Sequence, residues 1–277
     1  MTEFKNHNSK LKIILKAVLF CILFIGIFIA LSFLKTYIPG RFERLAHGII
    51  GTIAALLTTY LFIKYDRKTF ADIGLKIERA TVKKFFAGVL IGIAIMGFMA
   101  LCVILFSRFK IEINKNSDIL SFFLWTLPFI PLAFMEEMAF RAYPLRIIQD
   151  KSGVRIAIII TSILFALYHI VNGWTVIDAF LGTGSWGIIY GVAAVYSNGI
   201  SMPTGLHYAA NLTTAAVGIT DTSLNIWTIT QKDGSTLENY QGGQSITLIL
   251  QICFFIFAVI CMEWVLRKKK YHPHSKA

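Results

Sequence analysis

Long apolar runs without charged side chains are the feature that most constrains this chain. Residues 17–34 and 85–106 contain no Asp, Glu, Lys or Arg. A helix needs roughly 18 or more largely apolar residues to cross the hydrocarbon core of a bilayer. Apolar residues make up 56% of the chain, whereas soluble domains average roughly 45–50%. The sequence therefore predicts an all-α, polytopic membrane protein.

The apolar runs divide the chain into eight candidate spans, at about 12–34, 45–63, 85–106, 119–140, 155–171, 174–196, 203–219 and 245–266. The polar segments between them are too short to fold alone, so residues 1–277 are predicted to form a single integral-membrane domain. The first run is longer than the apolar region of a signal peptide, and no small-residue cleavage site follows it. We therefore expect it to be retained as the first span.

The basic residues indicate the orientation of the chain. With a cytoplasmic N-terminus, 20 of the 27 Lys and Arg residues fall in inner segments. This bias predicts that both termini are cytoplasmic (N-in/C-in). The count agrees, because an even number of spans places both ends on the same side. Although the net charge is +12, the basic residues flank apolar runs. They are therefore expected to contact lipid headgroups, and nucleic-acid binding is not expected.

Two Gly-x-x-x-Gly motifs lie inside predicted spans, at Gly88 and Gly92 and at Gly187 and Gly191. Small residues spaced in this way let two helix backbones approach closely. We interpret both motifs as packing sites between neighbouring helices.

Ionisable groups inside a span cost ~2.5–3.5 kcal/mol each on insertion scales, so each requires an explanation. Away from the span ends these are Glu136, Glu137, Arg141, His169 and His207, with Asn211 as a further polar group. The adjacent glutamates point ~100° apart on a helix. Glu137 and Arg141 are four residues apart and suited to an ion pair, which leaves Glu136 free to face a cavity. Alternatively, both glutamates mark the inner end of the fourth span.

His169, His207 and Asn211 lie on two further spans, with the latter two spaced to face the same way. A lone histidine in an apolar helix is more often a hydrogen-bonding group between helices. Together with Glu136, however, these groups have the chemistry to activate a water molecule, directly or through a metal ion. Neither His-Glu-x-x-His nor Gly-x-Ser-x-Gly occurs, which argues against a one-helix zinc site and a serine mechanism.

The three motifs resemble those of the CPBP family of intramembrane proteases, which includes the type II CAAX prenyl endopeptidases. Its Glu-Glu-x-x-x-Arg motif is matched from Glu136 to Arg141, its Phe-x-x-x-His motif from Phe165 to His169, and its His-x-x-x-Asn motif from His207 to Asn211. The motifs occur in the family's order within a core at residues 119–218. Ala142 stands where a glycine often follows the arginine of the family motif.

The resemblance implies an intramembrane endopeptidase acting on a membrane-associated peptide or protein. Glu136 would be the general base, Glu137 and Arg141 a structural ion pair, and His169, His207 and Asn211 ligands of the water, the metal or the oxyanion. Glu136, His169 and His207 would supply three ligands to a zinc ion. The resemblance also leaves open a glutamate-activated water without metal.

The substrate and the host are not given by these motifs. A bacterial cell membrane is expected, where a leader, pheromone or bacteriocin precursor is a more plausible substrate than a prenylated CAAX protein. Two other functions remain open. A non-catalytic relative would bind a partner membrane protein or confer immunity to a secreted peptide, and a proton-coupled transporter would use the same glutamates and histidines as a relay.

Overall fold

The computed structural model describes residues 2–107, 109–219, 225–231 and 243–271. Helices labelled α are α-helices, and those labelled η are 3₁₀- or π-helices. In chain order the elements are α1 (Thr2–Ser32), η1 (Phe33–Tyr37), η2 (Gly40–Phe42), α2 (Glu43–Asp66), η3 (Ala71–Ile73), α3 (Thr81–Phe106), β1 (Phe109–Ile113), α4 (Ile119–Thr126), α5 (Phe129–Glu137), η4 (Met138–Ala142), α6 (Tyr143–Ser152), α7 (Val154–Val171), η5 (Asp178–Thr183), α8 (Gly184–Ser197), α9 (Ser201–Ala216), β2 (Trp227–Gln231) and α10 (Gly243–Tyr271).

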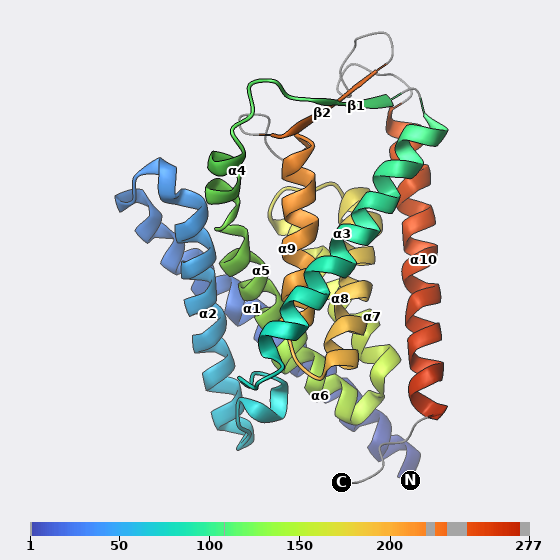
Figure 1. Ribbon diagram of the computed structural model, residues 1–277. Coiled ribbons are helices and arrows are strands. Elements are labelled where there is room, and N and C mark those ends of the chain that lie inside the picture. The colour runs from blue at the N-terminus through green and yellow to red at the C-terminus, as the bar shows by residue number, and fades with distance from the viewer. Residues whose placement is uncertain (1, 108, 220–224, 232–242, 272–277) are drawn as a thin grey trace.

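The helices form a bundle around α9, with α3 crossing in front of it and α10 along one side (Figure 1). The start of α1 and the end of α10 lie at the same end of the bundle (Figure 1). At the opposite end, β1 and β2 pair as a two-stranded antiparallel sheet in which Ile111 faces Ile229. The all-α, polytopic membrane architecture predicted from the sequence is confirmed, with this small sheet as an addition.

Seven stretches of the described chain are long and apolar enough to cross a membrane: Lys10–Tyr37, Gly40–Asp66, Thr81–Phe106, Ile119–Ser152, Val154–Val171, Asp178–Ser197 and Leu248–Lys268. The remaining predicted span, at 203–219, corresponds to α9, which has only 16 residues. Because most of its side chains are buried against other helices, α9 does not need an apolar surface towards lipid.

The predicted fourth span is longer than expected and is interrupted twice. Asp118 caps its start by accepting hydrogen bonds from the backbone N–H groups of Leu120 and Ser121. The first interruption lies at Pro128, between α4 and α5. The second is the π-helix η4, which lies just before Pro144. Proline has no N–H to donate and its ring clashes with the carbonyl four residues earlier, so a wider turn relieves this contact.

Glycines bring α3 and α9 into backbone contact. A Cβ atom built at Gly88 would lie 2.0 Å from the carbonyl oxygen of Met202, and one built at Gly205 would lie 2.0 Å from that of Phe85. A Cβ at Gly92 would meet Leu206 and Ala209 at 2.8 and 2.7 Å. Side chains at these positions would push the helices apart, so the glycines set the position of the helix that carries His207.

The second Gly-x-x-x-Gly motif packs α8 against α7. A Cβ at Gly191 would lie 3.1 Å from Ile158, and one at Gly187 would lie 3.1 Å from Ser162. Both predicted packing motifs therefore lie at close helix contacts, and the two interfaces hold α7, α8 and α9 around the buried end of α5.

Candidate active site

The predicted site residues come from four elements of the bundle. Glu136 and Glu137 end α5, Arg141 lies in η4, His169 lies in the last turn of α7, and His207 is in the buried first half of α9. A π-turn inserts extra backbone into a helix and is frequently found at functional sites. Here the π-turn lies between the two glutamates at the end of α5 and the start of α6.

Glu137 and Arg141 form a fully buried ion pair. Arg141 Nε lies 3.4 Å from Glu137 Oε2, and neither side chain is exposed. Arg141 Nη2 donates a hydrogen bond to the Gly187 carbonyl oxygen at 3.3 Å, and its guanidinium lies 4.2 Å from the centre of the Phe165 ring. The pair, from the end of α5 and from η4, thus contacts both α7 and α8.

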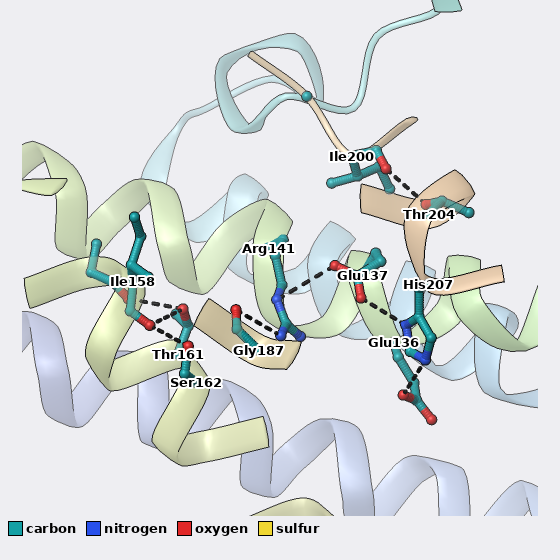
Figure 2. A network of polar contacts seen from close by, with 12 residues as sticks. Glu136, Glu137, Arg141, Ile158, Thr161, Ser162, Gly187, Ile200, Thr204 and His207 are labelled. Atoms are coloured by element: carbon teal, nitrogen blue, oxygen red, sulfur yellow. Dashed lines mark hydrogen bonds and ion pairs between the residues drawn. The ribbon is translucent and has the colours of Figure 1, made fainter. Parts of the chain in front are cut away.

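Glu137 also contacts His207, which the sequence did not indicate. His207 Nδ1 lies 2.9 Å from Glu137 Oε1 (Figure 2). Since an ionised carboxylate can only accept, Nδ1 carries the hydrogen and Nε2 of a neutral imidazole is left with a free lone pair. Glu137 therefore sets the tautomer of His207 in addition to neutralising Arg141.

The second nitrogen of His207 faces Glu136. His207 Nε2 lies 3.7 Å from Glu136 Oε2, which is beyond a direct hydrogen bond. The Glu136 side chain is 10% exposed, whereas that of Glu137 has no exposure. The imidazole therefore lies between two carboxylates, only one of which has its charge balanced by Arg141 (Figure 2).

His169 is tied to the same region through Phe165. Its Nδ1 lies 2.9 Å from the Phe165 carbonyl oxygen, so that nitrogen donates and Nε2 is again the free one. The Phe165 ring lies edge-on to both imidazoles, with centroids 4.5 Å from His169 and 6.0 Å from His207. The phenylalanine of the second motif thus separates the two histidines and packs beneath Arg141.

Asn211 lies one turn beyond His207 on α9 and is partly exposed. Within the described residues, the chain of ion pairs and hydrogen bonds joins Glu136, His207, Glu137 and Arg141 and does not reach Asn211. The structure therefore brings four of the six predicted residues into direct contact. His169 is added through ring packing, and Asn211 lies on the helix that holds His207.

Two residues of α8 belong to this site and were missed from the sequence. The missing side chain of Gly187 leaves room for Arg141, whose Nη2 would lie 3.2 Å from a Cβ there. The Tyr190 ring, 2% exposed, stacks on His207 at a centroid distance of 4.6 Å and an interplanar angle of 15°. The sequence marked Gly187 only as a packing glycine, and the spacing of three residues that places Tyr190 on the same helix face is the one signal for the tyrosine.

The predicted zinc ligands have suitable chemistry but not the necessary arrangement. Metal-bound histidines usually donate their other ring N–H to a carboxylate or backbone carbonyl, as His207 and His169 do here. However, no three His, Cys, Asp or Glu side chains in the described part of the chain are grouped closely enough to hold a metal ion. Glu136, His169 and His207 do not form a zinc site in this arrangement, and zinc binding stays a prediction.

Comparison with known proteins finds a family similarity over these residues. Residues 118–213 match the family model described as type II CAAX prenyl endopeptidase Rce1-like. This range contains all three motifs and every predicted site residue. No curated protein matches the chain. The match supports the resemblance drawn from the motifs: this integral membrane protein is similar to the Rce1-like type II CAAX prenyl endopeptidases over residues 118–213.

Proposed function

We propose that the protein is an intramembrane endopeptidase in which Glu136 activates a water molecule. The observation that carries this proposal is the placement of His207 between two carboxylates, with its Nδ1 2.9 Å from Glu137 Oε1 and its Nε2 3.7 Å from Glu136 Oε2. A water molecule beside Glu136 Oε2 and His207 Nε2 would have two acceptors for its hydrogens. That orientation directs an oxygen lone pair towards a peptide carbonyl.

The reaction uses these groups as follows. Glu136 takes a proton from the water as its oxygen attacks the carbonyl carbon of the substrate. The tetrahedral intermediate places a negative charge on the former carbonyl oxygen, to which Asn211 donates a hydrogen bond. Glu136 then returns the proton to the amide nitrogen, the C–N bond breaks, and a carboxylic acid and an amine are released. His169 supports this arrangement through the Phe165 ring, which lies edge-on to both imidazoles.

Burial favours this chemistry over a reaction in open solvent. The His207 side chain is 8% exposed and that of Glu136 is 10% exposed. A site that excludes bulk water strengthens the electrostatic interactions among the groups inside it. Arg141 and Glu137 hold the imidazole in one tautomer, so no proton has to be rearranged before the attack.

The membrane location and the family match support a peptide or protein as the substrate. We propose a peptide or protein that reaches the site from the membrane: either a prenylated CAAX sequence, or the leader of a secreted peptide in a bacterial membrane. The test is a panel of quenched fluorogenic peptides, both prenylated Cys-a-a-X peptides and unprenylated membrane-anchored precursors. The purified protein in detergent or liposomes would be compared with its Glu136→Gln variant.

Glu136→Gln keeps the shape of the side chain and removes its basicity. We expect cleavage to fall by ~10²–10⁴-fold, the usual contribution of a general base. His169→Ala and His207→Ala should be comparably inactive, while Asn211→Ala should lose only ~10²–10³-fold, as one oxyanion donor does. If no peptide in the panel is cleaved in a Glu136-dependent way, the enzyme proposal is wrong. The same side chains would then bind a partner protein or relay protons.

A further inference from the structure

Two kinds of contact hold the His207 ring: aromatic packing against its face, and the hydrogen bond between Nδ1 and Glu137. Tyr190 stacks on it with an interplanar angle of 15°, and the Phe165 ring approaches at 87°. Stacked and edge-to-face pairs at centroid distances of 4.6 and 6.0 Å lie within the favourable range for aromatic contacts. The imidazole therefore has one ring parallel to its plane and another perpendicular to it.

A hydrogen bond alone would not orient this imidazole. The bond from Nδ1 to Glu137 fixes one atom of the ring and leaves the plane free to turn about it. Nε2 would then swing relative to Glu136, 3.7 Å away. The face of Tyr190 removes this freedom, because a tilted imidazole would collide with it. Stacking and hydrogen bonding together determine where the free lone pair points.

Tyr190 is itself fixed by the helix that carries it. Arg141 donates to the Gly187 carbonyl oxygen at 3.3 Å, and Arg146 donates to the Ala194 carbonyl oxygen at 3.1 Å. These two carbonyls lie on either side of Tyr190 along α8. Trp186 adds a second stacked ring at a centroid distance of 5.6 Å from Tyr190. Two arginines following the paired glutamates thus set the height and rotation of α8.

We propose that Tyr190 is a positioning residue for catalysis: its ring orients His207 so that Nε2 faces the water activated by Glu136. This inference rests on the proposed endopeptidase function and adds a residue outside all three family motifs. The ring is what matters, and the hydroxyl group is dispensable. A misplacement of ~1 Å in a catalytic group can reduce a rate on the order of 10²-fold, so a packing residue is sufficient to produce a large effect.

The test compares Tyr190→Phe, which keeps the ring, with Tyr190→Leu, which removes it. We expect Tyr190→Phe to retain kcat, and Tyr190→Leu to lose ~10–100-fold in kcat with little change in KM. Phe20→Leu is the matched control. Phe20 is a fully buried aromatic residue of α1 that packs on Phe62 and Tyr143, away from His207. The Phe20→Leu variant should lose about as much thermal stability as Tyr190→Leu, and the kcat of its folded fraction should stay unchanged.

A spectroscopic measurement tests the stacking without any substrate. In protein carrying labelled histidine, the His207 ring signals are assigned by their loss in His207→Gln. The stacked Tyr190 ring should shift them upfield, and this shift should persist in Tyr190→Phe and vanish in Tyr190→Leu. Should Tyr190→Leu not accumulate, Tyr190→Met, which keeps the side-chain length without a ring, takes its place.

The outcomes separate this inference from the proposed function. Wild-type kcat in Tyr190→Leu, alongside an inactive Glu136→Gln, would overturn the positioning role alone. If Tyr190→Phe lost as much kcat as Tyr190→Leu, the effect would belong to the hydroxyl group, and the positioning role of the ring would also be overturned. An equal kcat loss in Phe20→Leu would show a general structural effect. If Glu136→Gln cleaves at the wild-type rate, it is the endopeptidase function that fails.

Discussion

Arg141 donates a hydrogen bond to the carbonyl oxygen of Gly187 at 3.3 Å, in space that a side chain at position 187 would restrict. The guanidinium reaches that carbonyl while its Nε faces Glu137, which in turn holds His207. A series of contacts from Gly187 to Arg141, Glu137 and His207 thus links α8 to α9 through η4 and the end of α5. Each of these contacts can be removed by a single substitution.

A methyl group at position 187 should disturb the arginine. The Cβ of Gly187→Ala would lie 3.2 Å from Arg141 Nη2 and 3.1 Å from Ser162. Overpacking of this kind costs ~1–3 kcal/mol, so we expect a lower melting temperature in detergent together with reduced peptidase activity. Gly182→Ala is the control, because its Cβ would meet only Gln251 at 3.8 Å. Equal melting of the two variants would contradict this account of Gly187.

The two adjacent glutamates should respond differently to the same substitution. Glu137→Gln leaves the buried Arg141 without a counter-charge, and breaking a buried ion pair typically costs ~3–5 kcal/mol. We expect low abundance and early melting for Glu137→Gln and for Arg141→Ala, but normal abundance for Glu136→Gln. Quantitative blotting and thermal unfolding in detergent would measure this. Normal accumulation of Arg141→Ala would show that the pair is not needed for folding.

The contact between α3 and α9 should be intolerant of side chains. In Gly205→Ala the new Cβ would lie 2.0 Å from the backbone oxygen of Phe85, and backbone cannot move aside without shifting a helix. Gly205→Ala should therefore displace His207 and lower both stability and activity. Gly97→Ala, on the same α3 but with nothing within 4 Å of its Cβ, should be neutral or slightly stabilising. A harmless Gly205→Ala would show that the helices are less tightly packed.

Metal dependence is tested separately from the role of Glu136. Activity that is lost with a chelator and restored by zinc would indicate that Glu136, His169 and His207 move together to bind the ion. Because these residues are not grouped as a ligand set here, we expect activity to persist after chelation. Metal analysis of the purified wild-type protein and of the His169→Ala variant gives the same answer without an assay of cleavage.

The orientation predicted from the basic residues can be tested by reporter fusions. Fusions after Lys84 and at the C-terminus should both report a cytoplasmic location, because 20 of the 27 Lys and Arg residues flank the inner ends of the predicted spans. The start of α1 and the end of α10 lie at one end of the bundle, as this orientation requires (Figure 1). An external signal from either fusion would reverse the topology.

The sequence by itself determined the membrane class, most of the spans and which ionisable residues lie inside them. These follow from local properties: the length of apolar runs, the cost of an ionisable group in lipid, and the four-residue spacing of Glu137 and Arg141. The interruption at η4 is also local in origin, since Pro144 lies in the sequence, but its effect on helix geometry was not predicted.

Only the tertiary structure decided which partner each polar group takes. His207 faces Glu136 and also hydrogen-bonds to Glu137, a contact that depends on the height at which α9 packs in the bundle. Tyr190 lies in no motif and Gly187 only in a packing motif, and their roles at the site arise from the neighbours that α8 brings to them. Spacing along one helix predicts contacts within that helix, whereas contacts between helices depend on their relative heights and rotations. Those are set by the packing of side chains that are distant in the chain.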